Sequence, residues 1–366
     1  MDSYIFDLLE THDYENIFFC QEKTLGLKAI IAIHDTTLGP AAGGIRMWPY
    51  ESEAEAIKDV LRLARGMTYK CAAAGASYGG GKCVVIGDPR HDKTEARLRI
   101  LGRFINRFNG LFLTGVDVGT TAEDMLVIRQ ETPYVVTVPE AWGGPGDSSQ
   151  ATAYGVVQGI RACLKEVYGS PDLQGRTIAL QGIGAVGKHA LKYLVEAGGI
   201  VTTTDIDHER ARLVATQYNA HIVSPEEINS LRVDVYCPCA LGNVLNDQTI
   251  PELRCKIVCG SANNQLGEDR HGDLLQAHGI LYAPDYIVNA GGLLYNLDSL
   301  NPGGFNRQRA MDQVSRLYVA MENIIAISKE QNIPTNRAAD VLAEQRIASI
   351  RQVKSLASGN ERQREK

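Results

Sequence analysis

Residues 176–187 read RTIALQGIGAVG, an apolar segment with β-branched residues followed by a glycine-rich turn. The segment predicts a buried strand, and a helix is expected from about Val186. The turn carries the pattern G-x-G-x-x-G at Gly182, Gly184 and Gly187. Eighteen residues after the last of these glycines, Asp205 follows the next strand-like segment, 200–204. Strand, glycine turn, helix and acid in this order predict a Rossmann-type dinucleotide-binding fold.

The same turn predicts the cofactor. Glycines let the backbone approach the pyrophosphate of a dinucleotide, which would lie at the N-terminus of the helix from Val186. Asp205 would accept hydrogen bonds from the adenosine ribose hydroxyls and repel a 2′-phosphate, so we predict NAD rather than NADP. His208 and Arg210, just downstream, would soften that preference. The alternative is a glycine-rich turn that binds nothing.

Strand-like and helix-like segments alternate after this turn. Apolar runs at 233–236, 256–259 and 280–282 continue the series. Such alternation predicts a parallel sheet with helices on both faces. The sharpest break in composition is PEAWGGPGDSS at 139–149, which we expect to be the hinge between two domains. The predicted domains are 1–145 and 146–332, followed by a C-terminal helical segment, 333–366.

Residues 66–82, GMTYKCAAAGASYGGGK, are the unusual stretch of the first half. They contain two lysines, Lys70 and Lys82, and the second directly follows three glycines. Lysine is seldom buried, so a lysine after such a run predicts a cation held where the backbone closely approaches another group. An exposed loop with two solvated charges is the alternative.

Regular elements are expected around the two lysines. Strands are predicted at 27–34, 83–87 and 111–117. The segment 36–48, which contains a glycine pair, is expected to be a loop. Ser52 and Glu55 form a capping-box pattern, which predicts a helix that leads into Lys70. Asp117 would then lie at the end of its strand.

Composition excludes several classes of protein. The chain has 366 residues, of which 44% are hydrophobic and 22% charged, as in ordinary globular proteins. A net charge of −6 without a basic run argues against nucleic-acid or anionic-membrane surfaces, and no apolar run is long enough to span a bilayer. The first residues carry acids where a signal peptide needs a basic region. The eight cysteines favour reduced thiols, and their spacing does not suit zinc. We therefore expect a cytoplasmic protein without a structural metal.

Eight motifs spread along the chain carry a family resemblance. They are GPAAGGIRMWPY (39–50), RGMTYKCAAAG (65–75), GGGKCVVIGDPR (79–90), TGVDVGTTAEDM (114–125), QGIGAVGK (181–188), CPCALG (237–242), GSANNQL (260–266) and YAPDYIVNAGGL (282–293). As a set they resemble the glutamate/leucine/phenylalanine/valine family of amino-acid dehydrogenases, and most closely its leucine, phenylalanine and tryptophan members. The resemblance implies an α/β substrate-binding and oligomerisation domain, a doubly wound NAD-binding domain, and C-terminal helices that pack back on the first domain. It also implies a homo-oligomer, either a dimer or an octamer.

The resemblance implies a role for each matching residue. Lys82 would be the catalytic base, because burial and a second nearby ammonium disfavour its charged form, and Asp117 would exchange a proton with the amino group. Lys70 would hold the substrate α-carboxylate with help from Asn263. The other implied substrate-binding residues are Gly43, Gly44, Met67, Ala42, Gly115, Val116, Asn289, Leu293 and Asn296. The implied cofactor-binding residues are Gly182, Gly184, Ala185, Val186, Gly187, Asp205, Ile206, Thr152, Cys239, Ala240 and Asn263.

The implied reaction is the NAD-dependent, reversible oxidative deamination of an L-amino acid to its 2-oxo acid and ammonia. Gly115 and Ala42 stand where leucine-type members have bulkier residues, so the predicted substrate is aromatic: phenylalanine, tyrosine or tryptophan. Asn296 stands where the family usually has an apolar residue, and it either meets a polar atom of the substrate or turns aside to a backbone group. A leucine- or valine-type dehydrogenase is the main alternative. A catalytically silent NAD-binding oligomer is another.

Overall fold

The structure is a computed structural model that describes residues 4–364, and the chain forms two compact units. The first unit comprises Met1–Gly146, Ser299–Phe305 and Ala343–Lys366, and the second comprises Asp147–Asp298 and Asn306–Leu342. Each unit is an α/β fold built on its own sheet. The predicted fold class is confirmed.

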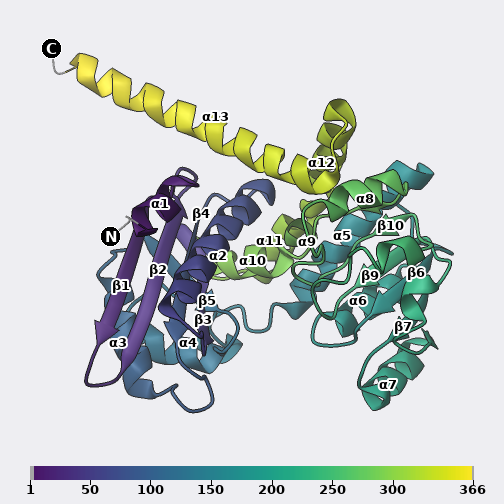
Figure 1. Ribbon diagram of the computed structural model, residues 1–366, viewed down its shortest axis with the longest axis horizontal. Helices are drawn as coiled ribbons and strands as arrows, with labels where there is room; N and C mark the ends of the chain where they lie inside the picture. The colour runs from purple at the N-terminus through teal and green to yellow at the C-terminus, as the bar shows by residue number, and fades with distance from the viewer. Residues whose placement is uncertain (1–3, 365–366) are drawn as a thin grey trace. The chain divides into compact units, whose positions relative to one another are not determined.

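The first unit is built on a five-stranded mixed sheet in the order β1-β2-β4-β3-β5 (Figure 1). Strand β2 is antiparallel to β1 and β4, whereas β3 runs parallel to β4 and β5. Its strands are β1 (Asn16–Glu22), β2 (Leu27–Asp35), β3 (Ala41–Trp48), β4 (Gly79–Ile86) and β5 (Phe112–Val116). Its helices are α1 (Tyr4–Glu10), α2 (Glu53–Ala73), α3 (Glu95–Asn106), α4 (Ala122–Arg129) and most of α13 (Thr335–Arg364).

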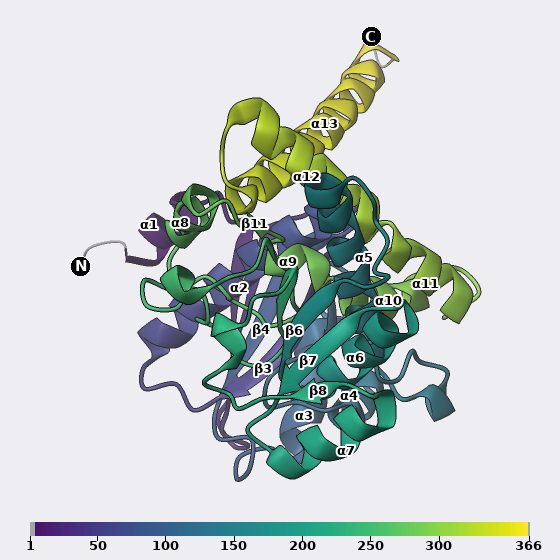
Figure 2. The ribbon, with the colours of Figure 1, turned by 90° about the vertical axis from the view of Figure 1, so that its right-hand side faces the viewer.

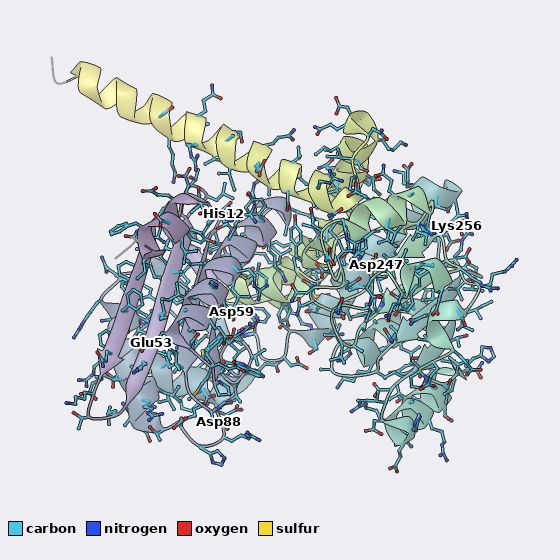
Figure 3. The ribbon with its side chains drawn as sticks, viewed as in Figure 1. His12, Glu53, Asp59, Asp88, Asp247 and Lys256 are labelled. Carbon is cyan, nitrogen blue, oxygen red and sulfur yellow. The ribbon has the colours of Figure 1, made fainter. Side chains whose placement is uncertain are left out.

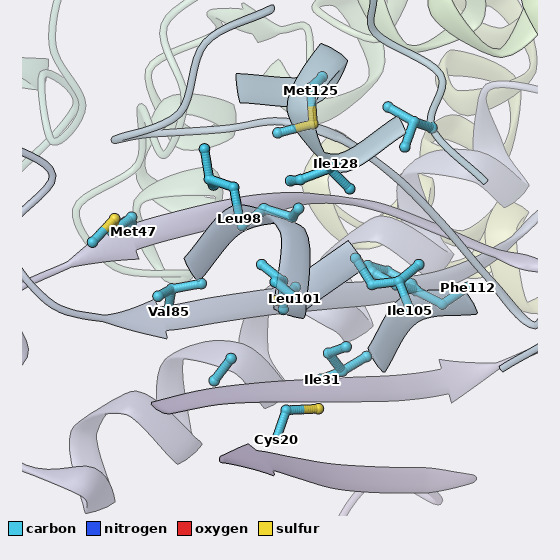
Figure 4. Close-up of a cluster of buried hydrophobic side chains, with 14 of the residues drawn as sticks. Cys20, Ile31, Met47, Val85, Leu98, Leu101, Ile105, Phe112, Met125 and Ile128 are labelled. Atoms are coloured by element: carbon cyan, nitrogen blue, oxygen red, sulfur yellow. The ribbon is translucent and has the colours of Figure 1, made fainter. Parts of the chain in front are cut away.

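Strand β2 shows why helices cover both faces of this sheet. Ile31 and Ile33 belong to the core cluster shared with α3 and α4, which Figure 4 shows around Leu101 and Ile128. The alternate residue, Ile30, joins the cluster on the α2 side. Since side chains alternate along a strand, an almost continuously apolar strand must be covered twice.

Two expectations about this sheet were wrong in part. The segment 36–48 was expected to be a loop, but most of it forms β3, and β4 begins at Gly79 rather than at Cys83. The glycines are required by close packing within the sheet. A Cβ added to Gly43 would lie 1.8 Å from the carbonyl oxygen of Gly81, and one added to Gly80 would lie 2.1 Å from the amide nitrogen of Thr68 on α2. Glycine runs that resemble loops can therefore lie inside a buried strand.

The helix starts follow their caps. The Ser52 hydroxyl accepts a hydrogen bond from the Glu55 amide at the start of α2, as predicted. Thr121 and Asp124 form a reciprocal capping box at the start of α4. These side chains satisfy amides that the first helical turn leaves without partners, which fixes where each helix begins.

The second unit is built on a six-stranded, entirely parallel sheet in the order β11-β10-β9-β6-β7-β8. This is the doubly wound arrangement that the alternating pattern predicts. Figure 2 labels four strands of the sheet: β6, β7, β8 and β11. The strands are β6 (Thr177–Gln181), β7 (Ile200–Thr204), β8 (His221–Ile222), β9 (Val235–Pro238), β10 (Ile257–Val258) and β11 (Leu281–Tyr282). The helices are α5 (Ser149–Tyr168), α6 (Gly187–Glu196), α7 (His208–Tyr218), α8 (His271–Ala277), α9 (Asp285–Val288), α10 (Gly291–Leu297), α11 (Arg307–Ser315) and α12 (Leu317–Gln331).

Helix α13 packs against the first unit through arginines. The Arg346 guanidinium donates hydrogen bonds to four carbonyl oxygens at the C-terminal end of α2, those of Cys71, Ala72, Gly75 and Ala76. A cation at this end of a helix is favoured by the helix dipole. Arg351 pairs with Asp35 at 2.6 Å. The expected return of the C-terminal helix to the first unit is thus confirmed. None of the helices in the described residues is long and apolar enough to cross a membrane.

Candidate active site

Lys82 lies in the middle of the first sheet, on β4 between β2 and β3. The residue is only 5% exposed, and its ammonium nitrogen Nζ lies 3.1 Å from Oδ2 of Asp117. Burial lowers the pKa of Lys82 below that of an ordinary lysine; the Asp117 carboxylate opposes this effect and the Arg46 guanidinium adds to it. The structure thus contradicts the solvated-loop alternative for Lys82.

Asp117 directly follows β5, and a short turn holds it in place. Its backbone amide donates to Thr120 Oγ1 at 3.0 Å, and that hydroxyl reaches the Ile45 carbonyl oxygen at 2.8 Å. Burial acts to raise the pKa of Asp117, but the charges of Lys82 and Arg46 outweigh it and hold that pKa below the usual value. Asp117 is therefore an anion placed between two cations.

Three residues of this network were missed from the sequence. Arg46 on β3 donates from Nε to Asp117 Oδ2 at 2.8 Å and from Nη1 to Asp59 Oδ2 at 3.0 Å. The Tyr50 hydroxyl donates to the same Asp59 oxygen at 2.7 Å. Asp59 belongs to α2 and is labelled in Figure 3. No local signal marks Arg46, because 36–48 was expected to be a loop. Gly44 and Arg46 share a face only because this segment is a strand, on which residues two apart point the same way.

The glycine pair of β3 lies against the backbone of Lys82 and the side chain of Asp117. A Cβ on Gly43 would lie 3.4 Å from the Cα of Lys82, and one on Gly44 would lie 2.9 Å from the Cβ of Asp117. The structure therefore brings Gly43, Gly44, Lys82 and Asp117 together. Close approach of the strands explains why both positions are glycine.

The other expected substrate-binding residues of the first unit lie on three elements. Ala42 is buried on β3, paired with Gly80, and Val116 at the end of β5 is 36% exposed. Met67 and Lys70 lie one turn apart on α2, both partly buried. Gly115 on β5 does not face open space: a Cβ there would lie 2.5 Å from Thr137 Oγ1. Packing against Thr137 is thus a second reason for a glycine at 115, besides room for a substrate.

The glycine turn of the second unit fits a dinucleotide. Gly182 has a φ of +94°, and a Cβ on Gly187 would lie 2.0 Å from the Gly182 carbonyl oxygen, so both positions require glycine. A Cβ on Gly184 would meet nothing within 4 Å, which leaves the backbone of the turn accessible. Ala185 and Val186 complete the turn, and α6 begins at Gly187. An open turn at a helix N-terminus provides amides suited to a pyrophosphate.

Asp205 lies at the carboxyl end of β7, next to this turn. Its carboxylate accepts hydrogen bonds from the amides of Ile183 at 2.7 Å and Asp207 at 2.9 Å, and from Arg210 Nη2 at 2.7 Å. Ile206, the next residue, is 85% exposed. Asp205 therefore remains an anion at the place where the fold binds a ribose, although Arg210 offsets part of its charge.

Two asparagines of the second unit are hydrogen-bonded to each other. Asn289 donates from Nδ2 to Asn263 Oδ1 at 2.8 Å and to the Ser261 carbonyl oxygen at 3.2 Å. Because the oxygen of Asn263 is used in this way, its amide nitrogen is turned elsewhere as a donor. Asn289 thus orients Asn263.

The remaining expected residues of the second unit lie on α5, α10 and the β9 loop. Asn296 on α10 donates to Ser148 Oγ at 3.5 Å, and Leu293 lies one turn before it. Thr152 packs near α10, since a Cβ on Gly292 would lie 2.6 Å from its hydroxyl. Cys239 lies just after β9, and a Cβ on Gly182 would lie 2.8 Å from that of Ala240. Cys239 and Ala240 therefore border the glycine turn.

One group of side chains in the described part of the chain has the proximity of metal ligands: Asp247, Glu268 and His271. Arg270 already pairs with both carboxylates. The Glu268 amide donates to Nδ1 of His271 at 2.8 Å, so the ring proton of the neutral imidazole lies on Nε2, the atom that faces Asp247. The two carboxylates thus contact Arg270, and the imidazole contacts Asp247 and the Glu268 amide.

A doubly wound parallel sheet with this glycine turn and acid is typical of dinucleotide-binding domains, and sequence comparison identifies the family. A model described as "Glu/Leu/Phe/Val dehydrogenase, dimerisation domain" matches residues 17–134. A second, "Glutamate/Leucine/Phenylalanine/Valine dehydrogenase", matches residues 143–208 and 204–355. The chain belongs to this family and is an NAD-dependent amino-acid dehydrogenase.

Its relatives act on different amino acids. The chain is 52% identical to a leucine dehydrogenase of Geobacillus stearothermophilus over 351 residues, which cover 96% of this chain and 95% of the relative. It is 47% identical to a phenylalanine dehydrogenase of Caldalkalibacillus thermarum, over 98% and 97% of the two chains. The crystal structure of L-tryptophan dehydrogenase from Nostoc punctiforme matches with a TM-score of 0.86 and 43% identity, over 95% of this chain and 99% of that one.

Proposed function

We propose that this protein catalyses the reversible oxidative deamination of an L-amino acid with an aromatic side chain to its 2-oxo acid and ammonia. The observation that carries the proposal is the buried Lys82 in contact with Asp117. A buried lysine of lowered pKa can lose its proton and then act as a base, and a neighbouring carboxylate can handle the second proton. Bound NAD supplies the chemistry of hydride acceptance from the substrate Cα.

Lys82 and Asp117 carry out the proton transfers. In the oxidative direction neutral Lys82 removes a proton from the water molecule that attacks the imino carbon. Asp117 exchanges a proton with the departing amino group through Oδ1. Its other oxygen, Oδ2, is already held by Lys82 and Arg46. This arrangement is supported by the pKa values of the two groups. Burial lowers the pKa of Lys82 and raises that of Asp117, and the charge of each group acts on the other in the reverse direction.

Binding of the substrate α-carboxylate is assigned to a lysine and an asparagine. The Lys70 ammonium supplies the charge, and the Asn263 amide, oriented by Asn289, supplies a further donor. Gly43 and Gly44 present backbone beside the catalytic pair. Fixed donors for the carboxylate hold the bound amino acid in one orientation, with its Cα toward the hydride acceptor.

NAD binding is assigned to residues that surround the glycine turn and the ends of the strands beside it. Asp205 binds the adenosine ribose, and the amides before α6 bind the pyrophosphate. The remaining residues assigned to this site are Gly182, Gly184, Ala185, Val186, Gly187, Ile206, Thr152, Cys239, Ala240 and Asn263. Ile206, highly exposed, suits contact with the adenine ring.

The aromatic preference rests on Ala42, Gly115, Val116, Met67 and Leu293. Small residues at 42 and 115 favour a roomier pocket, although a Cβ at 115 would point at Thr137, which is a packing reason for the glycine there. Leucine is the second candidate, and it is favoured by the 52% identity with a leucine dehydrogenase. Asn296 donates to Ser148 within its own unit, which supports a packing role over a substrate contact.

One assay separates these possibilities. Consumption of NADH is followed with ammonia and phenylpyruvate, 4-hydroxyphenylpyruvate, indolepyruvate or 4-methyl-2-oxopentanoate. We expect the highest kcat/KM with an aromatic 2-oxo acid. A higher value with 4-methyl-2-oxopentanoate would favour the leucine-type function, and no turnover with any acid, in protein that binds NADH, would overturn the reaction itself. In the same assay Asn296→Val tests whether the amide contributes to the choice between tyrosine- and phenylalanine-type substrates.

We also propose that the protein is a cytoplasmic homo-oligomer, either a dimer or an octamer. The match of residues 17–134 to a dimerisation domain supports assembly, and the free thiols of all eight cysteines support a reducing compartment. Light scattering of the purified protein measures the oligomer directly.

A further inference from the structure

The catalytic pair is connected to a third and a fourth charged group. Both Lys82 Nζ and Arg46 Nε contact Asp117 Oδ2, at 3.1 and 2.8 Å respectively. On its far side Arg46 is bound by Asp59, whose Oδ2 also accepts from the Tyr50 hydroxyl. The side chains of Arg46, Asp117 and Asp59 are only 22%, 23% and 18% exposed. They form a row of alternating charges that is largely shielded from solvent.

The row fixes which carboxylate oxygen is available. Both cations contact Oδ2, and no described residue donates a hydrogen bond to Oδ1 of Asp117. A carboxylate held at one oxygen by two donors cannot rotate without breaking both contacts. Because Arg46 is itself held by Asp59, the orientation of Asp117 is set from α2 as well as from β3 and β4.

The two cations on Oδ2 differ in kind. A buried lysine can lose its proton, whereas arginine remains charged throughout the accessible pH range. If Lys82 became neutral without Arg46 present, Asp117 would be left as a partly buried anion with no cation beside it, which is unfavourable. Arg46 therefore supplies the charge that stays constant while Lys82 gains and loses its proton.

We propose that Arg46 is a positioning residue for the reaction: it holds Asp117 at Oδ2, keeps it ionised when Lys82 is neutral, and favours the neutral form of Lys82. This inference rests on the proposed proton-transfer roles of Lys82 and Asp117. Asp59 and Tyr50 act through Arg46 by holding its far side. None of these three residues needs to touch the substrate.

The charges around Lys82 determine the direction of the expected pH effect. From β3 it faces Arg46, from the turn after β5 Asp117, and from α2 Asp59, while Tyr50 contacts Asp59 and the exposed Arg62 pairs with it at 2.7 Å. α2 also carries the cation Lys70, which the variants leave unchanged. Removing the Arg46 cation raises the affinity of Lys82 for its proton, and removing the Asp59 anion lowers it.

The test measures kcat of the oxidative reaction against pH at saturating amino acid and NAD, where the acid limb reports the deprotonation of Lys82 in the ternary complex. In Arg46→Gln we expect the acid limb to move up by about one pH unit, so that kcat at pH values on that limb falls about tenfold. Arg46→Lys keeps the cation, so its acid limb should lie close to that of the wild type. Asp59→Asn should move the limb in the opposite direction, to lower pH.

Arg99→Gln is the matched control, because Arg99 likewise bridges two carboxylates of the first unit, those of Glu95 and Glu131, away from Lys82. We expect its acid limb to coincide with that of the wild type. An acid limb in Arg46→Gln that coincides with the wild type, or an equal shift in Arg99→Gln, would overturn the proposal. If Arg46→Gln does not fold, the sign of the shift in Asp59→Asn decides. A wild-type enzyme without turnover would instead refute the proposed function, so the two failures are distinguishable.

Discussion

The ammonium of Lys82 lies 3.1 Å from Asp117 Oδ2, and the lysine is the more deeply buried of the two, with its side chain 6% exposed against 23%. The charge of the lysine therefore depends strongly on its partner. Burial alone would favour a neutral amine, and the carboxylate restores part of the affinity for the proton. The protonation of Lys82 is thus adjustable by changes at Asp117.

Asp117→Asn tests this dependence. Loss of the anion should lower the pKa of Lys82 further, so the acid limb of the kcat profile for oxidation should move to lower pH. The value of kcat itself should fall about 10²- to 10⁴-fold, because a proton-transfer group is removed. The measurement is residual NADH formation from pH 6 to 10, with NADH binding followed by fluorescence to show that the cofactor site is intact. A near-normal kcat would contradict the role of Asp117.

A second buried ionisable group lies on β2. Nδ1 of His34 lies 2.9 Å from Thr68 Oγ1, and its Nε2 lies 3.1 Å from the His12 carbonyl oxygen. A carbonyl can only accept, so Nε2 carries a proton, and in the neutral ring Nδ1 accepts from the Thr68 hydroxyl. Burial lowers the pKa of His34 to about 4.

His34 should therefore make the folded state sensitive to acid. The unfolded chain binds this proton below about pH 6.5, whereas the folded chain binds it only below about pH 4, so stability is present above pH 6.5 and is lost as pH falls toward 4. The expected loss is about 2–3 kcal/mol over this range. Urea unfolding at pH 7 and pH 5 should show a smaller difference for His34→Gln than for the wild type. The same replacement at the exposed His91 is the control. If His91→Gln reduces the difference in stability between pH 7 and pH 5 as much as His34→Gln does, the assignment to His34 is refuted.

The parts of the fold that the sequence predicts are those with a local signal. The parallel sheet, the glycine turn and Asp205 were predictable because strand, turn and helix follow one another within one short segment. Strand β8 was not, since His221 and Ile222 are both exposed and carry no apolar pattern. Strand β3 was missed because glycines weaken a strand pattern, and their use here depends on neighbouring backbone that is distant in sequence.

The candidate site shows the same division. Lys82 and Asp117 stand in motifs that resemble a family, so their partnership was predictable, and the structure brings them into contact. Arg46 and Asp59 lie thirteen residues apart on a strand and a helix, and nothing local indicates that they meet. Likewise, a Cβ at position 115 would point at Thr137, and this depends on how β5 packs, which a sequence motif does not show.

Two glycines of the first unit should respond oppositely to the same change. In Gly80→Ala the new methyl would lie 2.1 Å from the Thr68 amide nitrogen and 2.5 Å from the Ala64 carbonyl oxygen, so β4 and α2 must separate. We expect a loss of about 3 kcal/mol in the free energy of unfolding. In Gly66→Ala the methyl meets nothing within 4 Å on the exposed side of α2. Because alanine has the higher helix propensity, the free energy of unfolding should rise by about 0.5–1 kcal/mol. Urea unfolding of the two variants checks both signs, and a neutral Gly80→Ala would show that the two elements can separate without loss.

Gly115→Ala tests what sets the substrate preference. The added methyl would lie 2.5 Å from Thr137 Oγ1 and 3.2 Å from Val136 Cγ2, so it displaces β5 instead of filling open space. We expect this displacement to lower kcat/KM for phenylpyruvate relative to 4-methyl-2-oxopentanoate by about tenfold, because the larger side chain needs more of the pocket. An unchanged ratio would show that position 115 does not set the preference.

A second substitution distinguishes displacement from lost volume. Thr137→Ala removes the hydroxyl that the new methyl would meet, so β5 can keep its position in the double variant Gly115→Ala/Thr137→Ala. If displacement causes the loss, the double variant should recover the wild-type ratio of kcat/KM values, and Thr137→Ala alone should leave that ratio unchanged. If the double variant instead stays as selective as Gly115→Ala, the methyl itself occupies space that the aromatic ring needs. The glycine then acts through pocket volume, and its contact with Thr137 is a consequence of the strand position.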